Sequence, residues 1–211
     1  MPTPDPRAVV RAGYDRIEGA YSEWRRLEEG PVRARFIPEL LDAFKTGAGV
    51  LDIGCGDGVR SAPLIQHLSW VGVDLSWVQL SLARESFPSA RLVQADAARL
   101  PFRPASFDAV VAWYSLIHVP RQEHSVVFRA IADLLRPGGR TIFTLGTNDD
   151  PIGIEDDWLG VPMFWSGFDV DTSVRLIRAS RLEIESAEIV EEGEDEAERF
   201  LWIVARRMAE A

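Results

Sequence analysis

The stretch Val50-Leu51-Asp52-Ile53-Gly54-Cys55-Gly56-Asp57-Gly58 decides the fold of this chain. A short segment of strand character runs directly into a glycine-rich loop, and a helical pattern follows it. Glycine has no Cβ, so such a loop lets the backbone approach a ligand closely, and the following helix offers unpaired N–H groups. The stretch therefore predicts a strand, a ligand-binding loop and a helix in succession, with a nucleotide-like ligand at the loop.

Two common nucleotide-binding loops do not match this stretch. A dinucleotide-binding loop needs a glycine at the sixth position counted from Gly54, where this chain has Val59. A phosphate-binding loop of the ATPase kind ends in Lys followed by Ser or Thr, and no Lys stands near Gly58. We therefore expect neither hydride transfer nor hydrolysis of ATP or GTP.

Acids stand at the ends of the next two strand-like segments. Asp74 ends the segment Val71-Gly72-Val73-Asp74, and its carboxylate can accept both hydroxyls of a ribose. Asp96, in Gln94-Ala95-Asp96-Ala97, can accept the amino group of an adenine.

Apolar strand-like and amphipathic helix-like segments alternate along the chain, which is typical of a parallel sheet covered on both faces. We expect one domain over 1–211, with a doubly wound, mostly parallel seven-stranded sheet. The expected strands are 50–53, 70–75, 91–95, 107–114, 140–145, 183–191 and 199–207, and the expected helical segments are 7–28, 32–44, 59–68, 77–86, 122–135 and 170–180. The last two strands follow each other through a charged connection, which predicts an antiparallel edge.

The combined motifs resemble those of class I S-adenosylmethionine-dependent methyltransferases. The matching segments are Leu51–Gly58, Val73–Ser76, Ala95-Asp96, Leu100–Phe102, Ser106–Val110 and Leu135–Gly139. The resemblance is strong over about 50–145, and it implies a Rossmann-like methyltransferase fold whose cofactor is S-adenosylmethionine, released as S-adenosylhomocysteine.

The resemblance also implies the cofactor contacts. The loop with Gly54, Cys55, Gly56 and Gly58 would hold the methionine part, Asp74 with Leu75 the ribose, and Asp96 with Ala97 the adenine. Asp52 would meet the charged amino end of the ligand, directly or through water. We also expect Trp113 beside the cofactor and Tyr14 above it, because leading helices fold over the cofactor in similar enzymes; Tyr21 and Trp24 belong to the same segment.

The sequence signals for the site of the methyl acceptor are less specific than those for the cofactor. His118 is the candidate general base for a hydroxyl acceptor, and a loop histidine without a catalytic role is the alternative. The segment 148–168 is too long for an ordinary connection and is rich in aromatic residues, so we expect it to cover the acceptor site. The candidate acceptor-binding residues are Tyr21, Tyr114, His118, Trp158, Phe164 and Trp165; the alternative is that the aromatic residues of the insertion seal the sheet edge.

Acids crowd the same insertion at Asp149, Asp150, Glu155, Asp156 and Asp157. A divalent cation or a cationic acceptor would explain them, but a solvated loop is the interpretation that we favour. The metal-dependent members of this fold also carry an acid at the end of the fourth strand, where this chain has Tyr114-Ser115. We therefore expect no metal.

Charge and composition limit the partners. Lys and Arg total 23 against 33 Asp and Glu, a formal net charge of -10, which disfavours a nucleic-acid partner. The sequence has no membrane-spanning or signal pattern and a single cysteine, so we expect no membrane partner, a cytoplasmic location, and a monomer or homodimer.

The leading hypothesis is therefore a metal-independent methyltransferase that acts on O or N of a small metabolite by aligning the reactants. Two alternatives stay open: a methyltransferase for a protein-bound or carrier-bound acceptor, and a domain that binds S-adenosylmethionine without transferring its methyl group.

Overall fold

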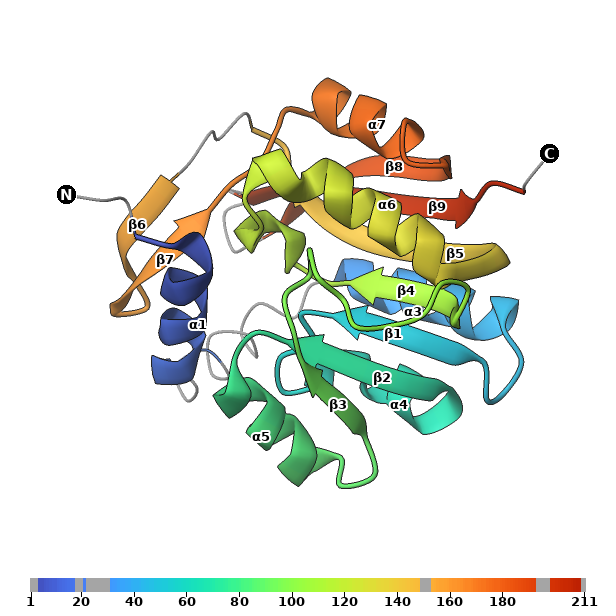
Figure 1. Cartoon of the computed structure of the whole chain (residues 1–211), viewed down its shortest axis with the longest axis horizontal. Coiled ribbons are helices and arrows are strands. Elements are labelled where there is room, and N and C mark those ends of the chain that lie inside the picture. Colours follow the sequence, from blue (N-terminus) through green and yellow to red (C-terminus); the bar gives the residue numbers. More distant parts are fainter. Residues whose placement is uncertain (1–3, 18–20, 22–30, 149–152, 193–197, 210–211) are drawn as a thin grey trace.

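The computed structural model describes residues 4–17, 21, 31–148, 153–192 and 198–209. Seven of the described strands form one sheet in the order β3-β2-β1-β4-β5-β9-β8 (Figure 1). The first five strands in this order are parallel, β9 is antiparallel to β5, and β8 is antiparallel to β9. The predicted doubly wound sheet with its reversed C-terminal strand is confirmed.

The strands follow the predicted order. Their bounds are β1 Gly49–Ile53, β2 Ser69–Asp74, β3 Arg91–Gln94, β4 Phe107–Ala112, β5 Leu135–Gly146, β6 Gly153–Trp158, β7 Val161–Trp165, β8 Leu182–Glu192 and β9 Glu198–Arg207. The helices are α1 Pro6–Arg16, α3 Pro31–Ala43, α4 Ala62–His67, α5 Trp77–Ser86, α6 His124–Leu134 and α7 Val170–Arg178. None of the described helices has the length and apolar character that a bilayer crossing requires.

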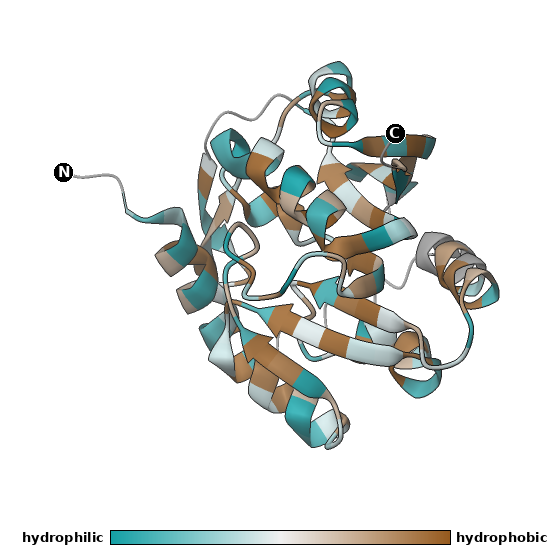
Figure 2. Cartoon of the chain, turned by 45° about the vertical axis from the view of Figure 1, so that its right-hand side comes forward, coloured by the Kyte–Doolittle hydropathy of each residue, from teal (hydrophilic) through white to brown (hydrophobic). Residues whose placement is uncertain are grey.

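Helices cover both faces of the sheet. Residues of α6 and α7 pack on one face together with Leu51 and Ile53 of β1. Residues of α3, α4 and α5 pack on the other face together with Val50. Figure 2 shows apolar residues concentrated along the strands between these helices. The two-sided burial explains why the parallel strands read as continuous apolar runs.

Most bounds lie within two residues of those expected, and α1 ends at Arg16, within the expected helical segment 7–28. Two further elements differ more. The expected helix 59–68 begins as the 3-10 turn Val59–Ser61 and continues as α4. The strand expected at 140–145 begins at Leu135, because Leu135 already pairs with Phe107 before the register shifts. The glycines of the Leu135–Gly139 motif therefore lie inside β5 and not in a preceding loop.

The aromatic insertion contains the antiparallel hairpin β6–β7, which the sequence did not predict. The hairpin packs against α1, and Figure 1 shows the two side by side. A separate core joins them through Val10 of α1, Ile17 directly after α1, and Met163 and Phe164 of β7. We call α1 together with the β6–β7 hairpin the lid. The predicted lid residue Trp24 and the acids Asp149 and Asp150 lie outside the described residues.

At Gly13, α1 lies close against the hairpin. A Cβ built on Gly13 would stand 2.7 Å from Cε of Met163 and 3.3 Å from the carbonyl oxygen of Pro162. The absence of a side chain at this position therefore lets α1 approach the hairpin.

We predict that Gly13→Val loosens α1 from the hairpin, because overpacking of such a contact costs about 1–3 kcal/mol. Amide hydrogen exchange over residues 6–16 should become faster. Ala12→Val, at an exposed position of the same helix, is the matched control. Equal exchange in the two variants would contradict the close packing.

Candidate active site

The glycine loop is fixed to the end of β2 by its own backbone. The N–H groups of Gly54 and Cys55 both donate to the carbonyl oxygen of Val73, at 2.7 and 2.9 Å. Gly54 has φ +72°, and a Cβ on it would stand 2.2 Å from Cβ of Ser115. A side chain at position 54 is therefore excluded both by backbone conformation and by the residues that follow β4.

Asp74 at the end of β2 faces this loop. Its Oδ2 accepts the N–H of Gly56 at 2.8 Å, and its Oδ1 accepts the N–H of Ser76 at the same distance. Burial raises the pKa of Asp74, and these two backbone donors lower it in part. Each carboxylate oxygen keeps a further lone pair, so Asp74 can still accept hydroxyl groups.

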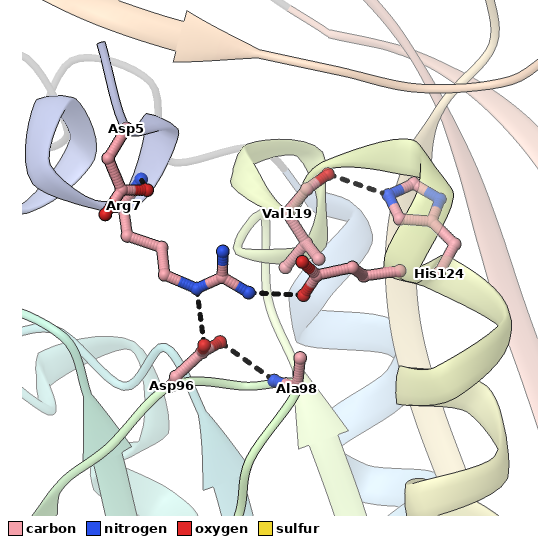
Figure 3. A network of polar contacts seen from close by, with 7 residues as sticks. Asp5, Arg7, Asp96, Ala98, Val119 and His124 are labelled. Carbon is pink, nitrogen blue, oxygen red and sulfur yellow. Dashed lines mark hydrogen bonds and ion pairs between the residues drawn. The ribbon is translucent and has the colours of Figure 1, made fainter.

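Asp96 lies beyond the end of β3 and is bonded from two sides (Figure 3). Its Oδ1 accepts the N–H of Ala98 at 2.9 Å, and its Oδ2 accepts Nε–H of Arg7 at 2.5 Å. Arg7 belongs to the first turn of α1 and also pairs with Glu123. Arg7 thus ties α1 to two separate elements below it.

One cleft connects these groups with the lid. It holds about 790 Å³ of space outside the protein atoms, including its open mouth. The sequence-predicted residues that line it are Tyr14, Tyr21, Gly54, Gly56, Asp74, Leu75, Asp96, Ala97, Trp113, Tyr114 and His118. The cleft runs past the carboxyl ends of β1, β2 and β4, where ligands bind in open α/β sheets.

His118 is held by both parts of the lid. Its Nδ1 lies 2.8 Å from the carbonyl oxygen of Phe164 in β7, and its Nε2 lies 2.8 Å from the hydroxyl oxygen of Tyr14 in α1. A carbonyl oxygen can only accept, so Nδ1 carries the proton and Nε2 accepts the hydroxyl proton of Tyr14. Burial lowers the pKa of His118 to about 4, although its bond to Phe164 opposes the shift. The imidazole is therefore neutral at physiological pH.

Aromatic rings surround this pair. The Tyr14 ring makes edge contacts with Tyr21 at 5.2 Å and Trp158 at 5.8 Å, and the His118 ring lies 4.6 Å from Trp165, between centroids. Burial raises the pKa of Tyr14 well above its ordinary value, so its hydroxyl stays protonated. Trp158, Phe164 and Trp165 support the residues of the cleft but do not line it.

Asp52 is not placed for direct contact with a ligand in the cleft. It is fully buried below the loop and does not line the cleft. Its Oδ2 accepts bonds from Ser61 Oγ at 2.5 Å and Trp70 Nε1 at 3.3 Å, and Trp113 Nε1 donates to Ser61 at 3.1 Å. Asp52 therefore supports Trp113 through Ser61, which is a different role from direct contact with a ligand.

Cys55 and Gly58 are likewise part of the loop without lining the cleft. Burial raises the pKa of the Cys55 thiol well above its ordinary value, and the charges of Asp74 and Asp52 add to this shift. Such a thiol is a packing group and not a nucleophile.

The cleft also includes residues that sequence reasoning missed. Arg7, Gln79 and Ser115 line it, and Ser115 Oγ donates to the carbonyl oxygen of Ile53 at 2.6 Å. Ser115 could have been found, because it follows the expected fourth strand. Nothing in the local sequence around Arg7 signals its contact with Asp96.

The described acids of the insertion do not line the cleft. Glu155, Asp156 and Asp157 are exposed in β6, and Glu155 accepts a bond from Trp165 Nε1 at 2.9 Å. Within the described ranges, no three His, Cys, Asp or Glu side chains lie close enough together to bind a metal ion.

The buried carboxyl of Asp52 gives a prediction about pH. Burial raises its pKa from 3.8 to about 7, so between these values the folded state holds a proton that the unfolded chain has released. The free energy of unfolding should therefore fall as pH rises through this window, by up to about 4 kcal/mol from this group. In urea titrations from pH 4 to pH 8, Asp52→Asn should lack this contribution.

The exposed Asp42→Asn is the control for this titration, because it should retain the pH dependence of the wild type. A stability difference between Asp52→Asn and the wild type that does not change with pH would contradict the buried position of Asp52.

Comparison with known proteins agrees with this geometry. Residues 50–139 match the family model of a methyltransferase domain. The 27-O-demethylrifamycin SV methyltransferase of Amycolatopsis mediterranei is 36% identical over 70% of this chain and 58% of its own length. A ubiquinone biosynthesis O-methyltransferase of Stutzerimonas stutzeri is 34% identical over 58% of this chain and 54% of its own length. The chain spans about half the length of the curated relatives it matches first.

Among solved structures, the 1,6-didemethyltoxoflavin-N1-methyltransferase of Burkholderia thailandensis, with bound 1,6-didemethyltoxoflavin and S-adenosylhomocysteine, superposes with a TM-score of 0.73. It is 21% identical, and the match covers 99% of this chain and 93% of that one, so it shows a common fold. The sheet order, the glycine loop and these matches together show that residues 50–139 belong to a methyltransferase-domain family and that the chain has the fold of class I S-adenosylmethionine-dependent methyltransferases.

Proposed function

We propose that this chain transfers a methyl group from S-adenosylmethionine to an O or N atom of a small metabolite, without a metal ion. The observation that carries the proposal is the cleft that runs from Asp96 and Asp74 past the glycine loop to Tyr14 and Tyr21. Such a cleft offers adjoining space for a long donor and a small acceptor.

The residues of the cleft fit the methyl donor. A Cβ on Gly56 would stand 3.6 Å from Oε1 of Gln79, so the bare loop backbone leaves room beside a polar side chain. Asp74 and Asp96 stand at successive strand ends with unused lone pairs for ribose and adenine. The loop backbone would hold the methionine part, Leu75 would contact the ribose, and Ala97 the adenine.

Bound S-adenosylmethionine supplies a methyl group on a positively charged sulfur. Such a displacement needs little covalent help, so the rate depends on alignment of the acceptor and on exclusion of water. Helix α1 of the lid lines the cleft, and the aromatic rings of Trp113 and Tyr14 can stabilise a nearby positive charge.

His118 stays our candidate catalytic residue for a hydroxyl acceptor. Because its Nε2 already accepts from Tyr14, an acceptor proton would reach His118 by way of the Tyr14 oxygen, or after the acceptor displaces that hydroxyl. The neutral imidazole has room for one proton at Nε2. Tyr21 and Tyr114 would then line the space that the acceptor occupies.

The names of the relatives support a small acceptor that is methylated at an oxygen or nitrogen atom. The names of two curated relatives refer to ubiquinone and rifamycin, and that of the structural neighbour to toxoflavin methylated at N1. Metal independence is supported by Tyr114-Ser115, which follow β4 where an acid would otherwise stand, and by the exposure of Glu155, Asp156 and Asp157.

The remaining expectations about partners are part of the same proposal. The net charge of -10 supports a partner that is neither nucleic acid nor an anionic membrane surface. A cytoplasmic location and a monomeric or homodimeric state stay predictions from the sequence.

The proposal is tested by calorimetry with S-adenosylmethionine, followed by detection of S-adenosylhomocysteine across a panel of hydroxyl and amine acceptors, with and without a chelator. We expect binding, turnover with a small acceptor, and no effect of the chelator. Binding without turnover on any free or carrier-bound acceptor would favour a domain that only holds the ligand.

We predict that Asp74→Ala weakens binding of S-adenosylmethionine at least about tenfold, because charged hydrogen bonds are worth about 1.5–3 kcal/mol each. Asp42→Asn, which removes an exposed acid, should bind like the wild type. Unchanged affinity in Asp74→Ala would make the ribose assignment wrong.

We predict that the imidazole of His118 titrates near pH 4, well below the ordinary histidine value near 6.5. Histidine signals in an NMR pH titration would measure this, with His118→Gln assigning the signal among the three histidines. His118 would thus stay neutral from pH 7 down to about pH 5. A midpoint near 6.5 would contradict the buried arrangement under the lid.

A further inference from the structure

Arg7 connects the lid to the adenine end of the cleft. It stands in the first turn of α1, its Nε donates to Asp96 Oδ2 at 2.5 Å, and its Nη2 pairs with Glu123. Figure 3 shows the side chain reaching from α1 toward Asp96. We call these three residues the Arg7 bridge.

The bridge is partly shielded from solvent. The side chains of Arg7 and Asp96 are 25% and 18% exposed, so water screens this pair less than an ordinary surface pair. Arg7 pairs with Asp96 and with Glu123, so one cation from α1 holds two acids of other segments. The bridge therefore favours the closed position of α1.

Asp96 is oriented by donors from two elements. The N–H of Ala98 holds Oδ1, and Arg7 holds Oδ2. A carboxylate has about four acceptor positions, so two remain for a ligand, and both Asp96 and Arg7 line the cleft. The bridge therefore fixes the direction in which the free lone pairs point.

We propose that Arg7 is a positioning residue for adenine recognition: it orients the carboxylate of Asp96 toward the amino group of the base and closes α1 over the same base. This inference rests on the proposed function. It adds that closure of the lid and selection of the base depend on one shared carboxylate.

Orientation of Asp96 by Arg7 affects which base the cleft prefers. An adenine amino group donates to a fixed carboxylate, whereas the carbonyl oxygen of hypoxanthine would face it with a second acceptor. If the Asp96 carboxylate is fixed, it faces the carbonyl oxygen of hypoxanthine without a hydrogen-bond donor, and this weakens binding of hypoxanthine strongly. If the carboxylate can turn away, binding of hypoxanthine is weakened less. Arg7 should therefore affect the ratio of the two affinities as well as the affinities themselves.

The experiment uses calorimetry on the full chain with S-adenosylhomocysteine and with its deaminated analogue, S-inosylhomocysteine. The variants are Arg7→Gln, Arg7→Lys and, as matched control, Arg11→Gln, which removes an exposed arginine one turn later on α1. Amide hydrogen exchange over residues 6–16 of each complex measures closure of the lid. Circular dichroism checks that each variant folds.

We expect Arg7→Gln to weaken S-adenosylhomocysteine binding about tenfold and to affect the inosine analogue less, so that the preference for adenine falls. Hydrogen exchange of α1 in the complex should become faster. Arg7→Lys keeps the charge but lacks the planar guanidinium, so it should restore part of the affinity and less of the preference. Arg11→Gln should match the wild type.

Two outcomes would overturn the inference. Equal weakening of both ligands by Arg7→Gln would mean that Arg7 only closes the lid, and no weakening would mean that the bridge is a surface contact. A wild-type chain that binds neither ligand would instead contradict the proposed function, and the inference with it.

Discussion

The close approach of the Gly54 backbone to Ser115 is the constraint on which the site depends. It brings the end of β1 against the residues that follow β4, while two N–H groups of the loop bind the carbonyl oxygen of Val73 at the end of β2. Three strand ends are thereby held at one edge of the sheet. Asp74 closes this arrangement by accepting the N–H of Gly56, so the acid that would meet a ribose also shapes the loop.

The second organising contact is His118, which joins two lid segments that are far apart in sequence. One ring nitrogen binds the carbonyl oxygen of Phe164 in the hairpin, and the other binds the hydroxyl of Tyr14 in α1. A neutral imidazole is required for this pattern, because only one nitrogen can accept. Burial provides that neutrality, because it lowers the pKa of His118 to about 4, and it also makes the imidazole a weaker base than an exposed histidine.

Much of the fold followed from the sequence because its signals are local. The β1 strand, the glycine loop and the acids at the end of β2 and just after β3 each occupy a few consecutive residues. The sheet order is the one typical of the methyltransferases that these motifs resemble. The burial of Asp52 could also have been predicted, because alternation along β1 puts it on the face of Val50 and opposite Leu51 and Ile53.

The lid could not be predicted to the same extent, because its contacts join distant segments. The β6–β7 hairpin is stabilised by packing on α1 through Gly13 and Met163, and no local pattern encodes that pairing. The contact of Arg7 with Asp96 likewise depends on where α1 docks. Local propensity is a weak guide where such tertiary contacts decide the structure.

A crystal structure of the protein with S-adenosylhomocysteine tests the central claim most directly. The account predicts adenine against Asp96 and Ala97, both ribose hydroxyls on Asp74, and the sulfur near Trp113 and Tyr14 under a closed lid. A ligand bound away from the carboxyl ends of β1, β2 and β3, or an adenine that makes no contact with Asp96, would contradict it.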